Sequence, residues 1–419
     1  SPDINSGDIT IQAKKFFFDA NINSGTMKNQ NGSAGNISLS GEQFKFYKAS
    51  TITASSLGTG QSGKIVLNAK HSIHLSGNIS SNAFYAGDAG TIEIRTPLLI
   101  MDNASKIYSL SSQTLNQTVP SGKGGDIIIH TDQLFLQDVA RISSKTNSDS
   151  SGGNISIHAT QFIDVNAFDA YEKMGLFSES NFKLNQDRQG NAGNISILTP
   201  VLMLKGKHAN IKSGTTTSGA GGNISLNVNQ LFLDENAIIS TQSQKNEDNA
   251  GNAGNIYINA KQKMSLFNNS SILTKAQNAS GGKIEINTSG SLILLDSLIE
   301  SSVKIGINNG GDIRIFHPDV IAMKSGKILA QAYQGNGGNI SISAENIIQS
   351  TESMIDASAL LGIDGYIHLD IPGKTSMNQV IQLPDNFLQA EKWSKTPCKL
   401  KNTVKEDRLV QSVRDSIPY

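Results

Sequence analysis

The sequence predicts an all-β protein, namely a right-handed three-sided parallel β-helix of about thirteen coils with a short irregular C-terminal cap. Three observations predict this fold. A short pattern, Gly-x-Ile-x-(Ile/Leu), recurs thirteen times in 419 residues. Two further short apolar runs follow in each unit, and the units leave no room for a helix. Finally, repeats at a spacing of roughly 20 to 50 residues are typical of solenoids.

Each repeat begins at a glycine and continues as a strand. Neighbouring anchor glycines are 27 to 40 residues apart, and the residue two positions after each of them is always isoleucine. Two positions further on the residue is Ile or Leu every time, whereas the residue between them is usually polar. This period of two predicts a strand with one buried face. The anchors are Gly7, Gly35, Gly63, Gly90, Gly125, Gly153, Gly193, Gly222, Gly254, Gly282, Gly311, Gly338 and Gly365.

Two shorter apolar runs complete the unit. The second run is exemplified by "LFL" at 134–136 and "VLML" at 201–204, and the third by "ARISS" at 140–144 and "ANIKS" at 209–213. One unit cannot bury its apolar face alone, so we expect each strand to pair in parallel with its equivalent in the next unit. The isoleucines would then form a continuous interior ladder. At a strand spacing of about 4.8 Å, thirteen coils would form a rod of roughly 60 Å.

A glycine and an asparagine precede many of the first strands, as in "GGNISI" at 152–157 and 337–342. The chain must turn a corner there, and glycine tolerates both a positive φ and the close approach of the next coil. Asparagine tolerates left-handed conformations, and stacked asparagine amides can hydrogen-bond from coil to coil. We therefore predict a structural turn and ladder at Gly35, Asn36, Gly153, Asn154, Gly193, Asn194, Gly222, Asn223, Gly254, Asn255, Gly338 and Asn339.

The composition argues against several functional classes. The 35 basic residues balance the 35 acidic ones, and only 17% of residues are charged, which argues against nucleic-acid binding. No apolar stretch approaches the length of a transmembrane segment. The single cysteine, Cys398, excludes internal disulfides. The seven histidines show no compact ligand spacing, so we expect neither a metal nor a cofactor.

The composition changes after Ile371, where prolines become more frequent. We therefore divide the chain into a β-helix repeat domain at 1–371 and a C-terminal cap or tail at 372–419. The segment "PDNFLQAEKW" at 384–393 has the signature of a helix start and carries apolar residues. An uncapped coil would offer its strand edges to other molecules, so we expect this segment to cover the last coil.

The repeated pattern "GGNISI", followed by "LFL" and "ISS", resembles the filamentous-haemagglutinin-like exoproteins of bacterial two-partner secretion, especially the cyanobacterial type. The resemblance covers about residues 5–371. The tail adds Leu383-Pro384, Cys398 and Ile417-Pro418 in comparable order, but it lacks the glycines of the family's last motif. The resemblance implies a pectin-lyase-like solenoid. Because the chain begins within an ordinary coil, we expect it to be the C-terminal part of a longer exoprotein.

The resemblance also implies a function without catalysis. Such a protein would be secreted or exposed on the bacterial cell surface. It would be exported by an outer-membrane two-partner-secretion transporter, which recognises a region that is not in this chain. Its solenoid would display loops that attach to host cells or glycans, with weak contacts adding through multivalency. The predicted function is therefore a filamentous adhesin or haemagglutinin-like stalk, with a passive stalk for a module outside this chain as one alternative.

The unit between Gly153 and Gly193 is the longest, at 40 residues, and its inserted loop at 166–189 is rich in aromatic residues. Long loops on a regular scaffold commonly carry binding functions. We consider four aromatic residues of this loop as ligand contacts, with packing over a hydrophobic seam as the alternative. These residues are Phe168, Tyr171, Phe177 and Phe182.

The other alternative is a polysaccharide lyase or hydrolase, because such enzymes also use β-helices. Asp102 and Asp138 follow the second runs of consecutive units. Stacked on each other, they would lie about 5 Å apart, which is the separation of the carboxylates in a retaining glycosidase. Asp19, Asp234 and Asp296 occupy nearly the same phase of their units, which favours a recurrent turn residue instead.

Overall fold

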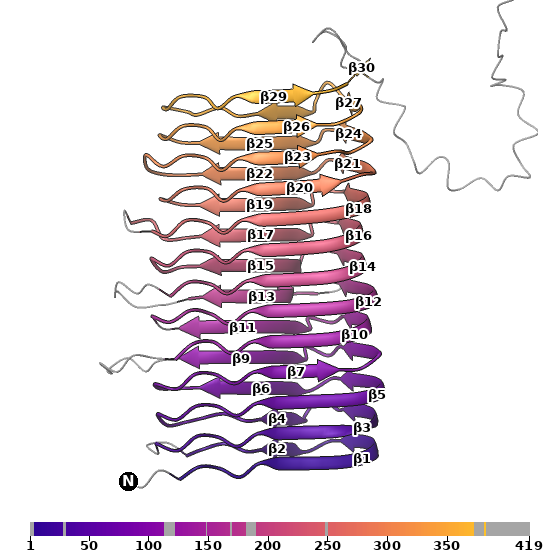
Figure 1. Cartoon of the computed structure of the whole chain (residues 1–419), viewed down its shortest axis with the longest axis vertical. Helices are drawn as coiled ribbons and strands as arrows, with labels where there is room; N and C mark the ends of the chain where they lie inside the picture. The colour runs from indigo at the N-terminus through magenta and orange to yellow at the C-terminus, as the bar shows by residue number, and fades with distance from the viewer. Residues whose placement is uncertain are drawn as a thin grey trace, which may run out of the picture. The chain divides into compact units, whose positions relative to one another are not determined.

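The computed structural model shows an all-β parallel β-solenoid of about 12 turns (Figure 1). The structure describes residues 4–27, 31–112, 122–147, 149–167, 170–181, 190–247, 250–372 and 381–382, and these ranges contain no helix. The chain divides into two units, Ser1–Gln382 and Leu383–Tyr419, and the solenoid belongs to the first. The predicted capping segment at 384–393 lies outside the described residues.

The first and second runs of every repeat lie in one parallel sheet of 18 strands. In eight coils the two runs join into one long strand, namely β1 (Ile9–Phe18), β3 (Ile37–Phe46), β5 (Ile65–Leu75), β10 (Ile127–Leu136), β12 (Ile155–Asn166), β14 (Ile195–Lys205), β16 (Ile224–Asp234) and β18 (Ile256–Leu266). The corner expected between the two runs is therefore a bend within a strand. Several coils mark this bend by a register shift, such as the one between Thr131 and Gln133.

In the other coils the two runs are separate strands of the same sheet. These are β7 (Ile92–Arg95), β8 (Leu98–Met101), β20 (Ile284–Thr288), β21 (Ser291–Leu295), β23 (Ile313–Phe316), β24 (Val320–Lys324), β26 (Ile340–Ser343), β27 (Ile347–Gln349), β29 (Ile367–Asp370) and β30 (Ile381–Gln382).

The third runs form a second parallel sheet of 12 strands. In stacking order they are β2 (Asn21–Asn23), β4 (Thr51–Thr53), β6 (Asn78–Ala83), β9 (Lys106–Ser112), β11 (Arg141–Asn147), β13 (Met174–Ser180), β15 (Ala209–Thr215), β17 (Ile238–Ser243), β19 (Ser271–Ala276), β22 (Leu298–Val303), β25 (Lys327–Ala332) and β28 (Met354–Asp356). The described ranges thus contain thirteen first runs but 12 third runs. The solenoid therefore has about 12 turns rather than thirteen.

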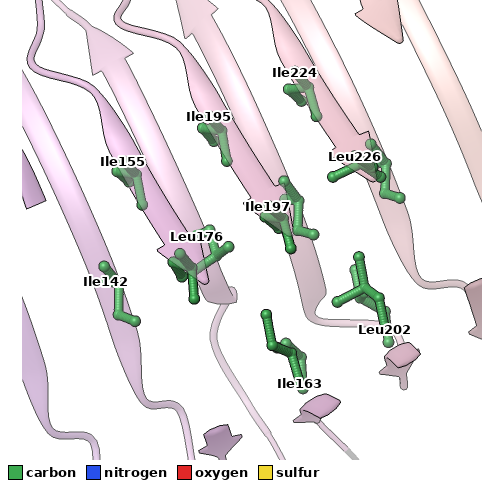
Figure 2. Close-up of a cluster of buried hydrophobic side chains, with 14 of the residues drawn as sticks. Ile142, Ile155, Ile163, Leu176, Ile195, Ile197, Leu202, Ile224 and Leu226 are labelled. Atoms are coloured by element: carbon green, nitrogen blue, oxygen red, sulfur yellow. The ribbon is translucent and has the colours of Figure 1, made fainter. Parts of the chain in front are cut away.

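The predicted isoleucine ladder is confirmed. The column pairs in register from Ile9 to Ile367 without a break. Every member from Ile37 to Ile340 is fully buried, whereas Ile367 in the last coil is 44% exposed. Stacking like on like therefore buries what a single coil could not. Figure 2 shows the column at Ile155, Ile195 and Ile224.

The second sheet contributes an equivalent column to the same core. It runs in register from Ile22 to Ile355, and it is fully buried from Ile79 to Ile328. Residues of both sheets belong to one hydrophobic cluster that extends through the stack (Figure 2). Each coil is therefore stabilised mainly by its two neighbours, as in other solenoids.

The second sheet also has a second inward column, which is polar although it is buried. In eight consecutive coils a serine or threonine stands two residues after the inward Ile or Leu, and its hydroxyl donates to the carbonyl oxygen of an anchor glycine. Ser213 Oγ, for example, lies 2.8 Å from the oxygen of Gly193. These bonds satisfy the hydroxyls and join the second sheet to the corner before the first strand. The column comprises Ser81, Ser109, Ser144, Ser178, Ser213, Thr241, Thr274 and Ser301.

Candidate functional site

The corner before each first strand contains a ladder of side-chain-to-backbone hydrogen bonds. Asn154 Oδ1 accepts from the backbone N–H of Asn194 at 2.9 Å, and Asn194 Oδ1 accepts from that of Asn223 at 2.8 Å. The expected amide-to-amide ladder is therefore replaced by bonds to the next backbone. The expected left-handed conformation is wrong, because the corner asparagines, all of them described, have no positive φ. Equivalent bonds are made by Asn36, Asn223, Asn255 and Asn339.

The anchor glycines are required by the close approach of neighbouring coils rather than by their φ. A Cβ on Gly193 would lie 2.2 Å from the carbonyl oxygen of Gly153, and one on Gly222 would lie 2.1 Å from that of Gly193. Both distances are well inside van der Waals contact, so no side chain fits there. The same approach is found at Gly35, Gly153, Gly254 and Gly338.

A shallow groove follows this corner across five coils. Glycine backbone forms much of its surface, and its polar lining includes Asp88, Lys123, Asp126, Asn154, Asn191 and Asn194. Because only glycine fits between the coils here, the groove results from the same packing constraint that sets the repeat. It presents polar groups at intervals of one coil, which suits contact with an extended polar chain.

The structure does not stack Asp102 on Asp138. Met101 pairs with Leu136 at the end of the second strands, so Asp102 lies level with Gln137, and Asp138 lies one residue further along. Asp138 is exposed and has a φ of 49°. This is the conformation of a turn residue, which Asp adopts more readily than most residues.

Asp102 instead contacts two side chains of the preceding coil. Its Oδ2 lies 2.7 Å from His74 Nε2, and its Oδ1 accepts hydrogen bonds from Ser76 Oγ at 2.5 Å and Asn103 Nδ2 at 3.0 Å. Burial raises the pKa of Asp102, but the bonds from Ser76, His74 and Asn103 outweigh burial and leave the pKa below its ordinary value. An ionised carboxylate suits a clamp between coils, whereas a general acid needs a raised pKa.

We expect Asp102→Asn to lower the free energy of unfolding by about 1 kcal/mol at pH 7, because charge-assisted hydrogen bonds are lost. The folded-state pKa is depressed, so the contribution of Asp102 is present above the unfolded-state value of about 3.9 and is lost as the pH falls through the folded-state value. Denaturation of both proteins at pH 7 and at about pH 2.5 measures the difference. A difference that does not shrink in acid would contradict a role for the ionised carboxylate, and Asp138→Asn is the matched control.

The longest coil differs from the expected single loop at 166–189. Strand β13 runs through it, because pairing with β11 and β15 continues the second sheet, and the extra residues are divided between connections before and after the strand. Phe177 lies in β13 and is 1% exposed, so it does not project from a loop as expected. Tyr171 is 75% exposed. Phe168 and Phe182 lie outside the described residues.

A charged cluster covers Phe177 on the outer side of the second sheet. The Arg141 guanidinium lies 3.9 Å from the centroid of the Phe177 ring. The Glu179 carboxylate lies 3.2 Å from Arg141 and 3.5 Å from Lys212, so that three successive coils each supply one charge. Burial lowers the pKa of both Arg141 and Lys212, and Glu179 partly offsets this effect. Two cations share one carboxylate, which leaves these three side chains with a net positive charge.

Within the described ranges no three His, Cys, Asp or Glu side chains are grouped so that they could hold a metal ion. The same part of the chain has no helix with the length and hydropathy needed to span a membrane.

Comparison with known proteins classifies this chain by its fold alone. No protein-family model matches it, and no curated protein or solved structure matches it either. The chain is a parallel β-solenoid of about 12 turns for which no family is identified.

Proposed function

We propose that this chain is a secreted or cell-surface stalk of the filamentous adhesin type, which holds binding segments away from the surface that carries it. The unbroken core is the observation that carries the proposal. One isoleucine column pairs in register from Ile9 to Ile367, so that no coil interrupts the stack. At about 4.8 Å per coil, 12 turns extend the solenoid unit over roughly 58 Å. A solenoid that gains its length by repeating one coil is suited to act as a spacer.

The attachment site in this proposal is the irregular coil around β13. Tyr171 is exposed there, and the cluster of Arg141, Glu179 and Lys212 carries an excess of positive charge. An exposed aromatic ring in the coil that also supplies Glu179 to the cationic cluster suits glycans that carry acidic sugars. Individually weak contacts would add when many copies are displayed on one surface.

The route of export in this proposal is two-partner secretion through an outer-membrane transporter. The sequence resemblance of the "GGNISI" repeats to such exoproteins supports it. The order of pairing supports it as well, because each strand pairs with its equivalents in the neighbouring coils. A chain that emerges unfolded could therefore fold coil by coil as it leaves the transporter.

Binding of the full chain to a glycan array and to host cells tests the proposal. We expect binding to acidic glycans that Tyr171→Ala weakens about tenfold, which corresponds to roughly 1.4 kcal/mol. Tyr257→Ala, at a 37% exposed tyrosine on a regular coil, is the matched control and should leave binding unchanged. A lack of binding across a broad panel of glycans and cells would contradict adhesion, and equal losses in both variants would contradict the assigned site.

A further inference from the structure

The outer side of the second runs carries a mostly apolar central row in the fourth to eleventh coils, which are anchored at Gly90 to Gly311. We call these outward side chains the lateral face. Its central row, in coil order, is Ile100, Phe135, Asp164, Met203, Phe232, Ser265, Ile293 and Ala322. Large apolar side chains flank this row at Leu98, Phe162, Val201, Phe267, Leu295 and Val320. Contiguous apolar surface of this kind typically marks an interaction site.

The apolar side chains of the lateral face are only partly covered by the chain itself. Ile100, Phe135, Met203, Phe232 and Ile293 are all half-buried although they point outward. The Phe135 and Phe162 rings of neighbouring coils lie edge to face with centroids 5.1 Å apart. On the outward positions of the first runs, by contrast, polar residues predominate, as at Glu93, Ser196 and Asn227. Within the part of the chain that the structure describes, nothing packs over the lateral face to complete its burial.

Six charged residues interrupt the lateral face. Asp164 lies in its central row, in the sixth coil, with Phe135 and Met203 as its neighbours in the row. Among the described residues no cation lies within ion-pair distance of Asp164, and burial raises its pKa. Lys263 lies in the ninth coil with its ammonium 5.7 Å from the Phe232 ring. The other four, on the edge next to the second sheet, are Asp102, Lys205, Asp234 and Lys324.

We infer that the lateral face binds a second copy of this chain, with the two solenoids antiparallel. The two-fold axis lies along the strand direction between the seventh and eighth coils, so that the sixth coil faces the ninth, the fifth the tenth and the fourth the eleventh. A two-fold axis makes each contact occur twice. In this register Met203 faces Phe232 of the second copy, and Phe135 faces Ile293.

The charges select this arrangement. Asp164 in the sixth coil faces Ser265 in the ninth coil of the second copy, and the long side chain of Lys263 starts two residues away on the same strand. By the same rule Lys205 in the seventh coil faces Asp234 in the eighth, and Asp102 in the fourth coil faces Lys324 in the eleventh. Four of the six charges therefore face an opposite charge directly, and Asp164 and Lys263 lie two residues apart along the strand. Complementary charges fix the register of an interface more than its affinity.

Three other two-fold arrangements oppose like charges. A parallel pair places every coil against its own copy, so that Asp164 meets Asp164. An antiparallel pair with its axis through the seventh coil places Lys205 against Lys205, and an axis through the eighth coil places Asp234 against Asp234. Like charges that face each other across an interface are strongly unfavourable. The register described above avoids all three conflicts.

The size of the lateral face predicts a reversible dimer. Eight coils at about 4.8 Å and five strand residues at about 3.3 Å, which present three outward side chains, give on the order of 600 Å² per copy. A total of roughly 1,200 Å² is at the low end of specific interfaces, so we expect a dissociation constant on the order of 10 μM. Such weak lateral contacts would be reinforced where many stalks are anchored side by side.

Sedimentation velocity of the full chain from about 1 to 200 μM tests the dimer. We expect Asp164→Lys and Lys263→Asp each to weaken dimerisation about tenfold, and the double variant to restore it to within about threefold of wild type. Ser196→Lys, an exposed change on the first-run side, should have no effect. Monomer at every concentration would overturn the inference, as would a double variant that dimerises no better than the single variants.

A crosslinking test checks the orientation independently. In a Cys398→Ser background, chains with Ile100→Cys are mixed with chains with Ala322→Cys and treated with a short bismaleimide, which spans the roughly 10 Å between packed sheets that a disulfide does not. The antiparallel register brings these two positions face to face, while two copies of Ile100→Cys remain seven coils, or about 34 Å, apart along the solenoids. We expect a crosslinked dimer in the mixture and none in either variant alone. Efficient linking of Ile100→Cys to itself would show a parallel pair and overturn the inference.

Discussion

Gly222→Ala is expected to lower the free energy of unfolding of the solenoid by about 3 kcal/mol or more, which is the upper range for overpacking a close-packed site. The added Cβ would lie 2.1 Å from the carbonyl oxygen of Gly193 and 2.6 Å from Ser213 Oγ. The first obstacle is backbone and cannot move aside as a flexible side chain would. The corner would have to open, which would break the Asn194–Asn223 ladder bond and the hydrogen bond from Ser213.

The first member of the same glycine column provides the matched control. Gly7 is followed by the same pattern, yet a Cβ there would meet nothing within 4 Å. Gly7→Ala should therefore change the free energy of unfolding by less than about 0.5 kcal/mol. Urea denaturation followed by circular dichroism compares the two variants with wild type. Equal effects at Gly222 and Gly7 would show that the contact between coils is not the reason for glycine.

Ile224→Ala is expected to lower the free energy of unfolding by about 3 to 4 kcal/mol, in the range found for large-to-small changes at fully buried sites. Ile224 is fully buried and pairs in register with Ile195 (Figure 2) and, on its other side, with Ile256. Its neighbours are held on both sides by strands, so they cannot collapse into the space that the substitution leaves. The cavity therefore adds to the lost burial of the side chain.

Ile367→Ala is the control from the same column. Ile367 pairs with Ile340 on one side only and is 44% exposed, so its substitution should cost less than half as much. Thermal or urea denaturation measures both changes. If both substitutions lowered the free energy of unfolding equally, Ile367 would belong to the core rather than lie at its exposed end. If neither costs more than about 0.5 kcal/mol, the isoleucine column would not be the core.

The repeat predicted the core because one physical requirement acts at every coil. An isoleucine two residues after each anchor glycine must point inward, since a shift by one residue would expose it. The alternation therefore revealed the strand, its buried face and its partners. The glycine corner was also predictable, although only one of its two expected causes applies. Close approach excludes side chains at Gly222, whereas a positive φ plays no part there.

Features that depend on spatial neighbours were not predictable from the alternation alone. The length of its coil predicts a loop at Phe177, yet pairing of β13 with β11 and β15 makes this residue part of a strand. Asp102 and Asp138 have almost the same distance from their anchor glycines, but a difference of one residue places them at different levels. Local spacing does not show where a corner absorbs an extra residue.

A pattern in the sequence does indicate the lateral face. Runs such as "LFL" at 134–136 and 231–233 place an apolar residue at the middle position, which points outward between two inward leucines. A strand with one solvated face would be polar there. The departure from alternation therefore marked an outward apolar row, and only the register of the coils shows that its charges are arranged in complementary pairs.

The measurement that tests the central claim most directly is the distance between spin labels on the outward column of the first runs. Ser38, Ser196 and Ser341 belong to this column in the second, seventh and twelfth coils. After replacement of Cys398, pairs five coils apart should give about 24 Å, and the pair ten coils apart should give about 48 Å. Dilution with unlabelled chain removes distances between molecules. Narrow distributions in a ratio of about two are the result that the stacked solenoid predicts, and broad distributions or a different ratio would contradict it.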